Sequence, residues 1–123
     1  MIPEVTAMNE ILEQTLLYDF YGELLTEHQK EIYEQFVLED LSLSEIAEQA
    51  VISRQGVHDL VKRCQKTLEG YEAKLHLVEK FLSVREKVNQ IGETLTEYER
   101  DKKDPGEMAA RIREISDMII EEL

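Results

Sequence analysis

The sequence predicts an all-α protein with a helix-turn-helix and an added helical hairpin at its C-terminus. Apolar residues recur at steps of three and four through most of the 123 residues, whereas strand-like alternation is almost absent. Two prolines and five scattered glycines leave little room for turns. Ser, Thr or Asp precedes most of the periodic stretches, so predicted N-caps divide the chain into separate helices.

Two helices are predicted before the turn motif. The first runs from about Val5 to Leu25, and Thr26 with Gln29 forms a capping box that begins the second, which ends near Leu38. The apolar stripe of the first helix consists of Met8, Ile11, Leu12, Leu16, Leu17, Phe20, Tyr21, Leu24 and Leu25. That spacing places a broad apolar face on one side of the helix.

The helix-turn-helix is predicted at about residues 43–66. Ser42 and Glu45 form a capping box for a short helix, and Ser53 is the N-cap of the longer helix that follows. Ala47 is the small residue where the two helices nearly touch. The predicted apolar contacts are Ile46, Ala50, Ile52, Val57 and Leu60. Val51 lies where such a turn usually has Gly with positive φ, so we expect either a distorted turn or a different, looser one.

The second helix of the motif carries candidate nucleic-acid contacts. Its outward residues are Arg54, Gln55, His58, Asp59 and Lys62, with Arg63 and Lys66 close by. Residues near the start of this helix face base edges in DNA-bound helix-turn-helix proteins. Arg pairs with guanine and Gln with adenine, while basic residues further along meet phosphates. This pattern predicts DNA binding.

The distribution of charge supports protein binding as an alternative to DNA binding. The chain has 27 acidic and 14 basic residues, a net charge of −13, which argues against a general nucleic-acid coat protein. Residues 1–50 carry 12 acids and 1 base, whereas residues 51–76 carry 3 acids and 5 bases. The basic window favours DNA, but the acidic body complements basic partners. A protein-interaction module without sequence-specific DNA binding therefore remains open.

The C-terminal part predicts a second structural element. We divide the chain into a helical domain at residues 1–82 and a hairpin at 83–123. Heptad steps run from Leu68 to Leu82 and from Phe81 to Tyr98, and Ser83 with Glu86 resembles a capping box, which suggests a break there. The last helix has Asp104 as its cap, Pro105 at its first position and Glu107 completing the box.

The apolar face of the last helix leads us to predict that the protein self-associates. This face consists of Met108, Ile112, Ile115, Ile119 and Leu123. Leaving such a face in water is costly, so it must dock on the chain's own first helix or on a second copy. We expect a homodimer with this face at the interface, because paired recognition helices read two half-sites.

No catalytic or cofactor motif is found. The three histidines have no zinc-site spacing, the five glycines form no phosphate loop, and the single Cys64 lies on an apolar helix side as a small buried residue. We therefore expect neither an enzyme, a metal site, a cofactor nor a small-molecule substrate. No apolar run is long enough for a membrane span, no signal peptide is recognisable, and a single cysteine fits a reducing compartment, so we expect a cytoplasmic protein.

Residues 25–68 resemble the promoter-reading C-terminal domain of sigma factors. More closely, residues 14–82 are similar to the YlxM family of small cytosolic proteins of Gram-positive bacteria. This similarity rests on the segments Tyr18–Gly22, Leu24–Thr26, Ser53–Gln55 and Tyr71–Leu75. It implies a DNA-binding or regulatory role in the signal recognition particle pathway, inferred from the family's gene neighbourhood, with the particle's GTPase or its RNA complex as a partner.

The same resemblance points to individual residues. The positions that match the family's recognition helix are Ser53, Arg54, Gln55, His58, Lys62 and Arg63. Gly56 and His58 depart from the alanine and tyrosine expected in the family, so a shared base preference is not implied.

Overall fold

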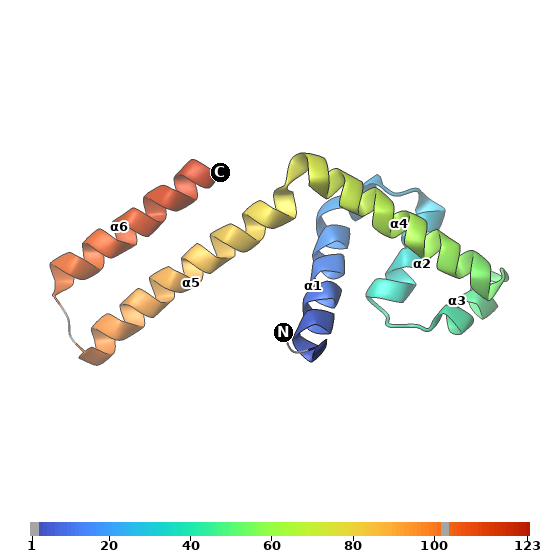
Figure 1. Ribbon diagram of the computed structural model, residues 1–123, viewed down its shortest axis with the longest axis horizontal. Coiled ribbons are helices and arrows are strands. Elements are labelled where there is room, and N and C mark those ends of the chain that lie inside the picture. Colours follow the sequence, from blue (N-terminus) through green and yellow to red (C-terminus); the bar gives the residue numbers. More distant parts are fainter. Residues whose placement is uncertain (1–2, 102–103) are drawn as a thin grey trace. The chain divides into compact units, whose positions relative to one another are not determined.

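The computed structural model describes the backbone of residues 3–101 and 104–123, and the side chains of Glu10 and of residues 12–101 and 104–123. All regular elements in these ranges are helices, which confirms the all-α helix-turn-helix fold (Figure 1). The chain forms two compact units, Met1–His76 and Leu77–Leu123. No helix in the described ranges combines the length and hydrophobicity that crossing a bilayer requires.

The first unit contains four α-helices. They are α1 (Pro3–Tyr21), α2 (Glu27–Val37), α3 (Leu43–Ala50) and α4 (Arg54–Leu75), with a 3₁₀ turn at Gly22–Leu24 after α1. The predicted first helix therefore ends as an α-helix four residues early. Gly22 lies against the Tyr18 ring, since a Cβ there would be 2.8 Å from Tyr18 Cε2.

The predicted stripe of α1 is only partly buried. The side chains of Val5, Met8 and Ile11 lie outside the described residues. Leu16, Leu17, Tyr21 and Leu25 are buried, whereas Leu12, Phe20 and Leu24 are exposed. Among the described side chains of α1, the buried ones therefore begin at Leu16.

The predicted N-caps of α2, α3 and α4 are confirmed. The Gln29 amide donates to Thr26 Oγ1 at 3.2 Å, and the Thr26 amide donates to Gln29 Oε1 at 3.1 Å. Ser42 and Glu45 form the same reciprocal pair. At the start of α4, the Gly56 amide donates to Ser53 Oγ at 2.9 Å. Each cap satisfies amides that the first helical turn leaves without an intrahelical partner.

The core beneath the helix-turn-helix joins α2, α3 and α4. It consists of Ile32, Ile46, Ala47, Val57 and Val61, bordered by Phe36, Leu41, Leu43, Ala50 and Leu60. Ile52 differs from its prediction as a core contact, because it lies in the turn and 37% of it is exposed. Cys64 is fully buried as predicted, and burial raises the pKa of its thiol, the reverse of what a reactive thiolate needs.

Aromatic contacts tie α1 to the rest of this unit. Tyr18 stacks on Tyr33 with ring centroids 5.9 Å apart, and its hydroxyl donates to Glu34. The Tyr21 hydroxyl donates to Glu72 Oε1 at 2.6 Å, which connects the end of α1 to the last turns of α4. Tyr18 and Tyr21 thus combine apolar packing of their rings with hydrogen-bonded hydroxyl groups.

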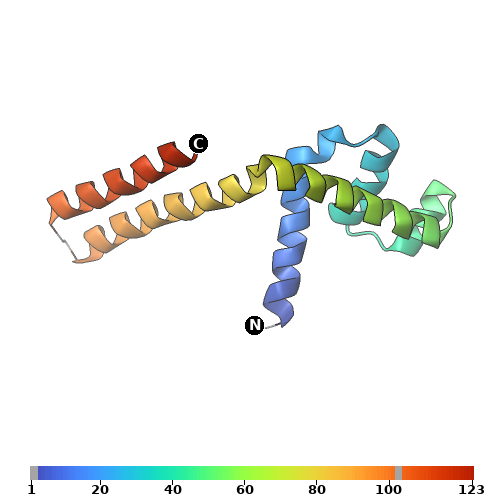
Figure 2. The same cartoon turned by 45° about the horizontal axis from the view of Figure 1, so that its top comes forward.

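The second unit is an antiparallel pair of helices, α5 (Leu77–Asp101) and α6 (Pro105–Glu122) (Figures 1 and 2). Asp104 caps α6 through the Gly106 amide at 3.1 Å, with Pro105 at the first helical position as predicted. Lys102 and Lys103 of the predicted turn lie outside the described residues.

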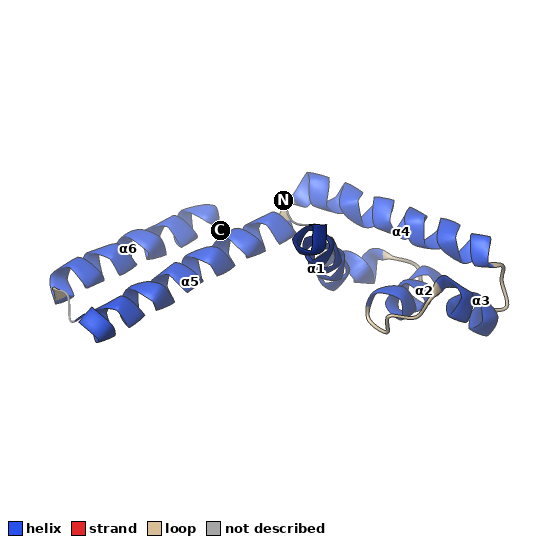
Figure 3. Ribbon diagram, turned by 60° about the horizontal axis from the view of Figure 1, so that its bottom comes forward, coloured by secondary structure: helices blue, strands red, loops and turns tan. Residues whose placement is uncertain are grey.

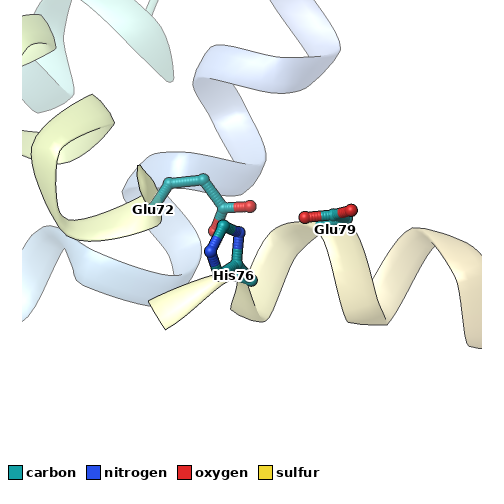
Figure 4. A group of neighbouring side chains, drawn as sticks. All are labelled: Glu72, His76 and Glu79. Atoms are coloured by element: carbon teal, nitrogen blue, oxygen red, sulfur yellow. The ribbon is translucent and has the colours of Figure 1, made fainter. Parts of the chain in front are cut away.

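The predicted helix break at Ser83 is wrong. The α5 helix runs unbroken through Ser83, and the Ser83 hydroxyl instead donates to Glu122 Oε1 at 2.5 Å. The chain breaks at His76, the C-cap of α4, which has φ 57° (Figure 4). The apolar seam predicted from Leu68 to Leu82 is accordingly divided between two helices.

A small polar network joins the start of α5 to the end of α6. Lys87 Nζ lies 2.8 Å from Glu122 Oε2 and donates to Ser83 Oγ at 3.0 Å. Its hydrogen bond to Glu122, together with that of Ser83, holds the pKa of this carboxyl below its usual value. The folded hairpin therefore favours the charged form of Glu122.

We expect this network to make the hairpin sensitive to acid. A carboxyl with a lowered pKa stabilises the folded state above its unfolded pKa, and this stabilisation is lost as the pH falls through the folded value. Glu122→Gln should therefore flatten the loss of thermal stability below about pH 4.5, measured by circular dichroism from pH 7 to pH 3. Glu121→Gln, which removes an equal charge at an exposed neighbour, is the control. Equal flattening in both variants would contradict the role of Glu122.

Candidate nucleic-acid interface

A short loop connects α3 to α4 (Figure 3), and its first residue, Val51, has the left-handed geometry that such a turn requires. Val51 has φ 57° and ψ 44°, and the Ile52 amide donates to the Ala47 carbonyl at 3.2 Å. Contrary to the expectation from the sequence, the turn is neither distorted nor looser, because Val51 adopts nearly ideal left-handed angles. The valine side chain is 89% exposed, so no packing offsets the strain of its backbone, about 1–2 kcal/mol.

Val51→Gly is expected to raise the free energy of unfolding by up to about 1 kcal/mol. The relieved strain exceeds the extra conformational entropy that glycine gives the unfolded chain, about 0.5–1 kcal/mol. Urea denaturation measures the difference. Val51→Ala keeps the Cβ and should gain less; an equal gain from both variants would show that the left-handed conformation is not the source of strain.

The first turn of α4 suits a negatively charged ligand. Its amide groups lie at the positive end of the helix dipole, and no acidic residue occurs in the turn. Arg54, an exposed cation, is the first residue of the helix. This end of α4 can therefore approach a phosphate or the acceptor atoms of a base without repulsion from its own first turn.

An exposed row continues along α4 away from the core. It consists of Gln55, Asp59, Lys62 and Lys66. Steps of four, three and four residues keep these side chains on one face of the helix, opposite the buried Val57 and Val61. Two lysines on this face are spaced to follow a phosphate backbone.

Gln55 has a partner within its own helix. Its Nε2 donates to Asp59 Oδ1 at 2.9 Å, and His58 Nδ1 lies 3.5 Å from the same oxygen. Binding an adenine edge through Gln55 would therefore require this contact to rearrange. Asp59, on the outward face, thus has a role that the predicted DNA contacts do not include, and the i, i+4 spacing of Gln and Asp is the sequence signal for this pairing.

The structure gathers the predicted site residues on one helix and its cap. Most are exposed: Ser53, Arg54, Gln55, Lys62, Arg63 and Lys66. His58 is half-buried, and the Ser53 hydroxyl accepts the cap hydrogen bond from Gly56. Ser53 therefore shapes the start of α4, while the basic side chains around the outer face are open to a ligand.

The family comparison agrees with this helix-turn-helix. The UPF0122 family, described as "Putative helix-turn-helix protein, YlxM / p13 like", matches residues 8–108 of the chain. The chain belongs to this family. The match covers all of the candidate site on α4 and confirms the resemblance to YlxM seen in the sequence.

Individual UPF0122 proteins are similar over most of their length. The protein of Caldanaerobacter subterraneus subsp. tengcongensis is 51% identical over 87 residues, 71% of this chain and 74% of its own. That of Thermoanaerobacter sp. strain X514 is 48% identical over 96 residues, 76% of this chain and 82% of its own. A Clostridium kluyveri member is 41% identical over 95 residues, which are 77% of this chain and 86% of its own.

Proposed function

We propose that this protein is a cytoplasmic DNA-binding regulator that places the start of α4 in the major groove. The observation that carries the proposal is the exposed Arg54 and Gln55 at the start of a capped helix-turn-helix, followed by basic residues on the same helix. In this pose Arg54 pairs with a guanine edge and Gln55 with an adenine edge. Lys62, Arg63 and Lys66 contact phosphates.

The charge of the chain limits this mode of binding. Residues 51–76 carry five basic and three acidic side chains, whereas the whole chain carries −13. We therefore expect the face around α4 to be the surface that approaches DNA. We expect affinity that depends steeply on salt, since neutralising phosphates releases counterions.

A fluorescence-anisotropy titration of the full chain against genomic fragments tests the proposal. Three phosphate contacts predict a slope of log K against log salt of about −3. Binding to one fragment that bulk DNA does not displace, with this dependence on salt, would support regulation through a specific site. Absence of binding at about 50 mM salt would contradict the proposal.

The second candidate function is binding to a basic protein or its RNA complex. It is favoured by residues 1–50, which carry 12 acids and 1 base, and by a cavity of about 290 Å³ on the acidic hairpin, lined in part by Glu93, Glu97 and Glu107. The YlxM resemblance indicates the signal recognition particle GTPase as this partner. Calorimetry with the purified particle protein distinguishes the two functions; no binding below about 100 μM, a free energy of roughly −5.5 kcal/mol, would count against it.

Dimerisation belongs to the DNA-binding proposal, because two recognition helices then read two half-sites. The residues of the expected interface on α6 differ in how far they are exposed. Met108, Ile112 and Ile119 are half-buried and Ile115 is fully buried, whereas Leu123 is 82% exposed. Much of this face is therefore already occupied within the hairpin, and the exposed apolar surface of α5 is the better starting point for a contact between two copies.

A further inference from the structure

Helix α5 exposes a row of large apolar side chains at heptad spacing. Phe81, Val88 and Leu95 are 40%, 53% and 41% exposed, and each is seven residues from the next. Residues seven apart lie almost in line along an α-helix. The row thus covers about four turns of the helix.

Val88 and Leu95 of this row form the exposed edge of a wider apolar stripe. Val84, Ile91 and Tyr98 lie on the adjacent side of α5 and are half-buried. In helical bundles an apolar stripe of this width packs against more than one neighbouring helix. Within this unit α6 is the only described helix beside α5, so one side of the stripe is left for a further helix.

Gly92 lies on the same exposed face, between Val88 and Leu95. A Cβ added at Gly92 would meet no atom within 4 Å, so no contact in the described part of the chain requires glycine here. Glycine nevertheless costs about 1 kcal/mol relative to alanine in a helix interior. Its absent side chain would allow another helix to approach the backbone of α5 closely.

The charges of α5 differ between its two halves. Residues 77–90 carry three basic and two acidic side chains, whereas residues 91–101 carry one basic and four acidic side chains. An antiparallel copy of α5 places the basic half of each helix beside the acidic half of the other. A parallel copy would place like charges side by side, which is unfavourable.

We propose that α5 docks antiparallel against α5 of a second copy across a two-fold axis, through Val88, Gly92 and Leu95. With the axis near residue 90, Val88 of one copy faces Gly92 of the other, and Arg85 comes within about one helical turn of Glu99. Two hairpins joined in this way form a four-helix arrangement. This inference deepens the dimer of the proposed function and moves its main contact from α6 to α5.

Sedimentation of the full chain without DNA tests the proposal. We expect a species of twice 14.4 kDa at tens of micromolar, and Val88→Glu should weaken the dimer at least tenfold. Ile120→Glu, at a 68% exposed position on α6, is the control and should leave the dimer intact. A monomer at about 100 μM, or a dimer that Val88→Glu leaves unchanged, would overturn the proposal.

A matched glycine pair separates docking from folding. Gly92→Leu should dissociate the dimer while raising helix stability, whereas Gly70→Leu on α4, also with open space at its Cβ, should leave association unchanged. If Gly92→Leu and Gly70→Leu changed association equally, the proposed close approach of the helices at Gly92 would be wrong.

A charge swap tests the antiparallel orientation. Arg85→Glu and Glu99→Arg should each weaken the dimer, and the double variant should restore it. Failure of this rescue would overturn the orientation. Because these measurements omit DNA, a chain that dimerises but binds no DNA contradicts only the proposed function, and a DNA-binding monomer contradicts only this inference.

Discussion

Replacing Ile46 by alanine is expected to lower the free energy of unfolding by about 2–5 kcal/mol. Ile46 is fully buried in the core where α2, α3 and α4 meet. Removing three carbon atoms there loses their transfer free energy and leaves a cavity that the surrounding helices can fill only in part. Because whole domains are stable by about 5–15 kcal/mol, this change removes a large share of the total.

Urea denaturation at fixed protein concentration measures this effect. Leu38→Ala is the control, since Leu38 follows the last turn of α2 and is 52% exposed. Its expected cost is below about 1 kcal/mol, as for most exposed substitutions. If Ile46→Ala cost no more than Leu38→Ala, the contact between α3 and its neighbours would not be the core of this unit.

The helix starts could be predicted because capping is local. Thr26 with Gln29 and Ser42 with Glu45 each satisfy backbone amides within four residues. The local sequence is therefore enough to predict these hydrogen bonds. Ser83 and Glu86 have the same spacing, but no helix begins there. There a residue 39 positions away, Glu122, accepts the serine hydroxyl, and helical pairing between α5 and α6 overrides the local preference.

The end of α4 could not be predicted from its residues. A left-handed C-cap usually carries glycine or asparagine, but His76 occupies it with φ 57°. The three- and four-residue spacing of apolar residues continues past the end of α4, so this spacing predicts one continuous apolar seam from Leu68 to Leu82. The Tyr21 hydroxyl bond to Glu72, at 51 residues' separation, holds the last turns of α4 against α1, and sequence periodicity contains no signal for it.

The outward face of α4 could be predicted because an α-helix advances about 100° per residue. Buried Val57, Val61, Cys64 and Leu68 fix the inner side, and the basic residues then fall opposite. The i, i+4 spacing permits the pairing of Gln55 with Asp59 but does not require it, because side-chain partners depend on rotamers as well as spacing. Arg54, next to the cap and outside this pair, is therefore the sharper test of base recognition.

Arg54→Ala is expected to lower affinity for the preferred DNA sequence by about 1–3 kcal/mol, a factor of roughly 5 to 150. Arg54 is exposed at the first position of α4, where a guanidinium can donate two hydrogen bonds to a guanine edge. Bulk DNA offers this contact only by chance, so its affinity should change less. Preference for the specific site should therefore fall along with affinity.

Lys62→Ala provides the contrasting result. Lys62 lies two turns further along the exposed row, where it is expected to meet a phosphate, so its loss should weaken all sequences alike and reduce the salt slope by about 1. Lys74→Ala, in the last turn of α4, is the matched control and should change neither quantity. Anisotropy titrations of the three variants at two salt concentrations supply both readouts. If Arg54→Ala weakened specific and bulk DNA equally, Arg54 would be a phosphate contact, and base recognition would have to lie elsewhere on α4.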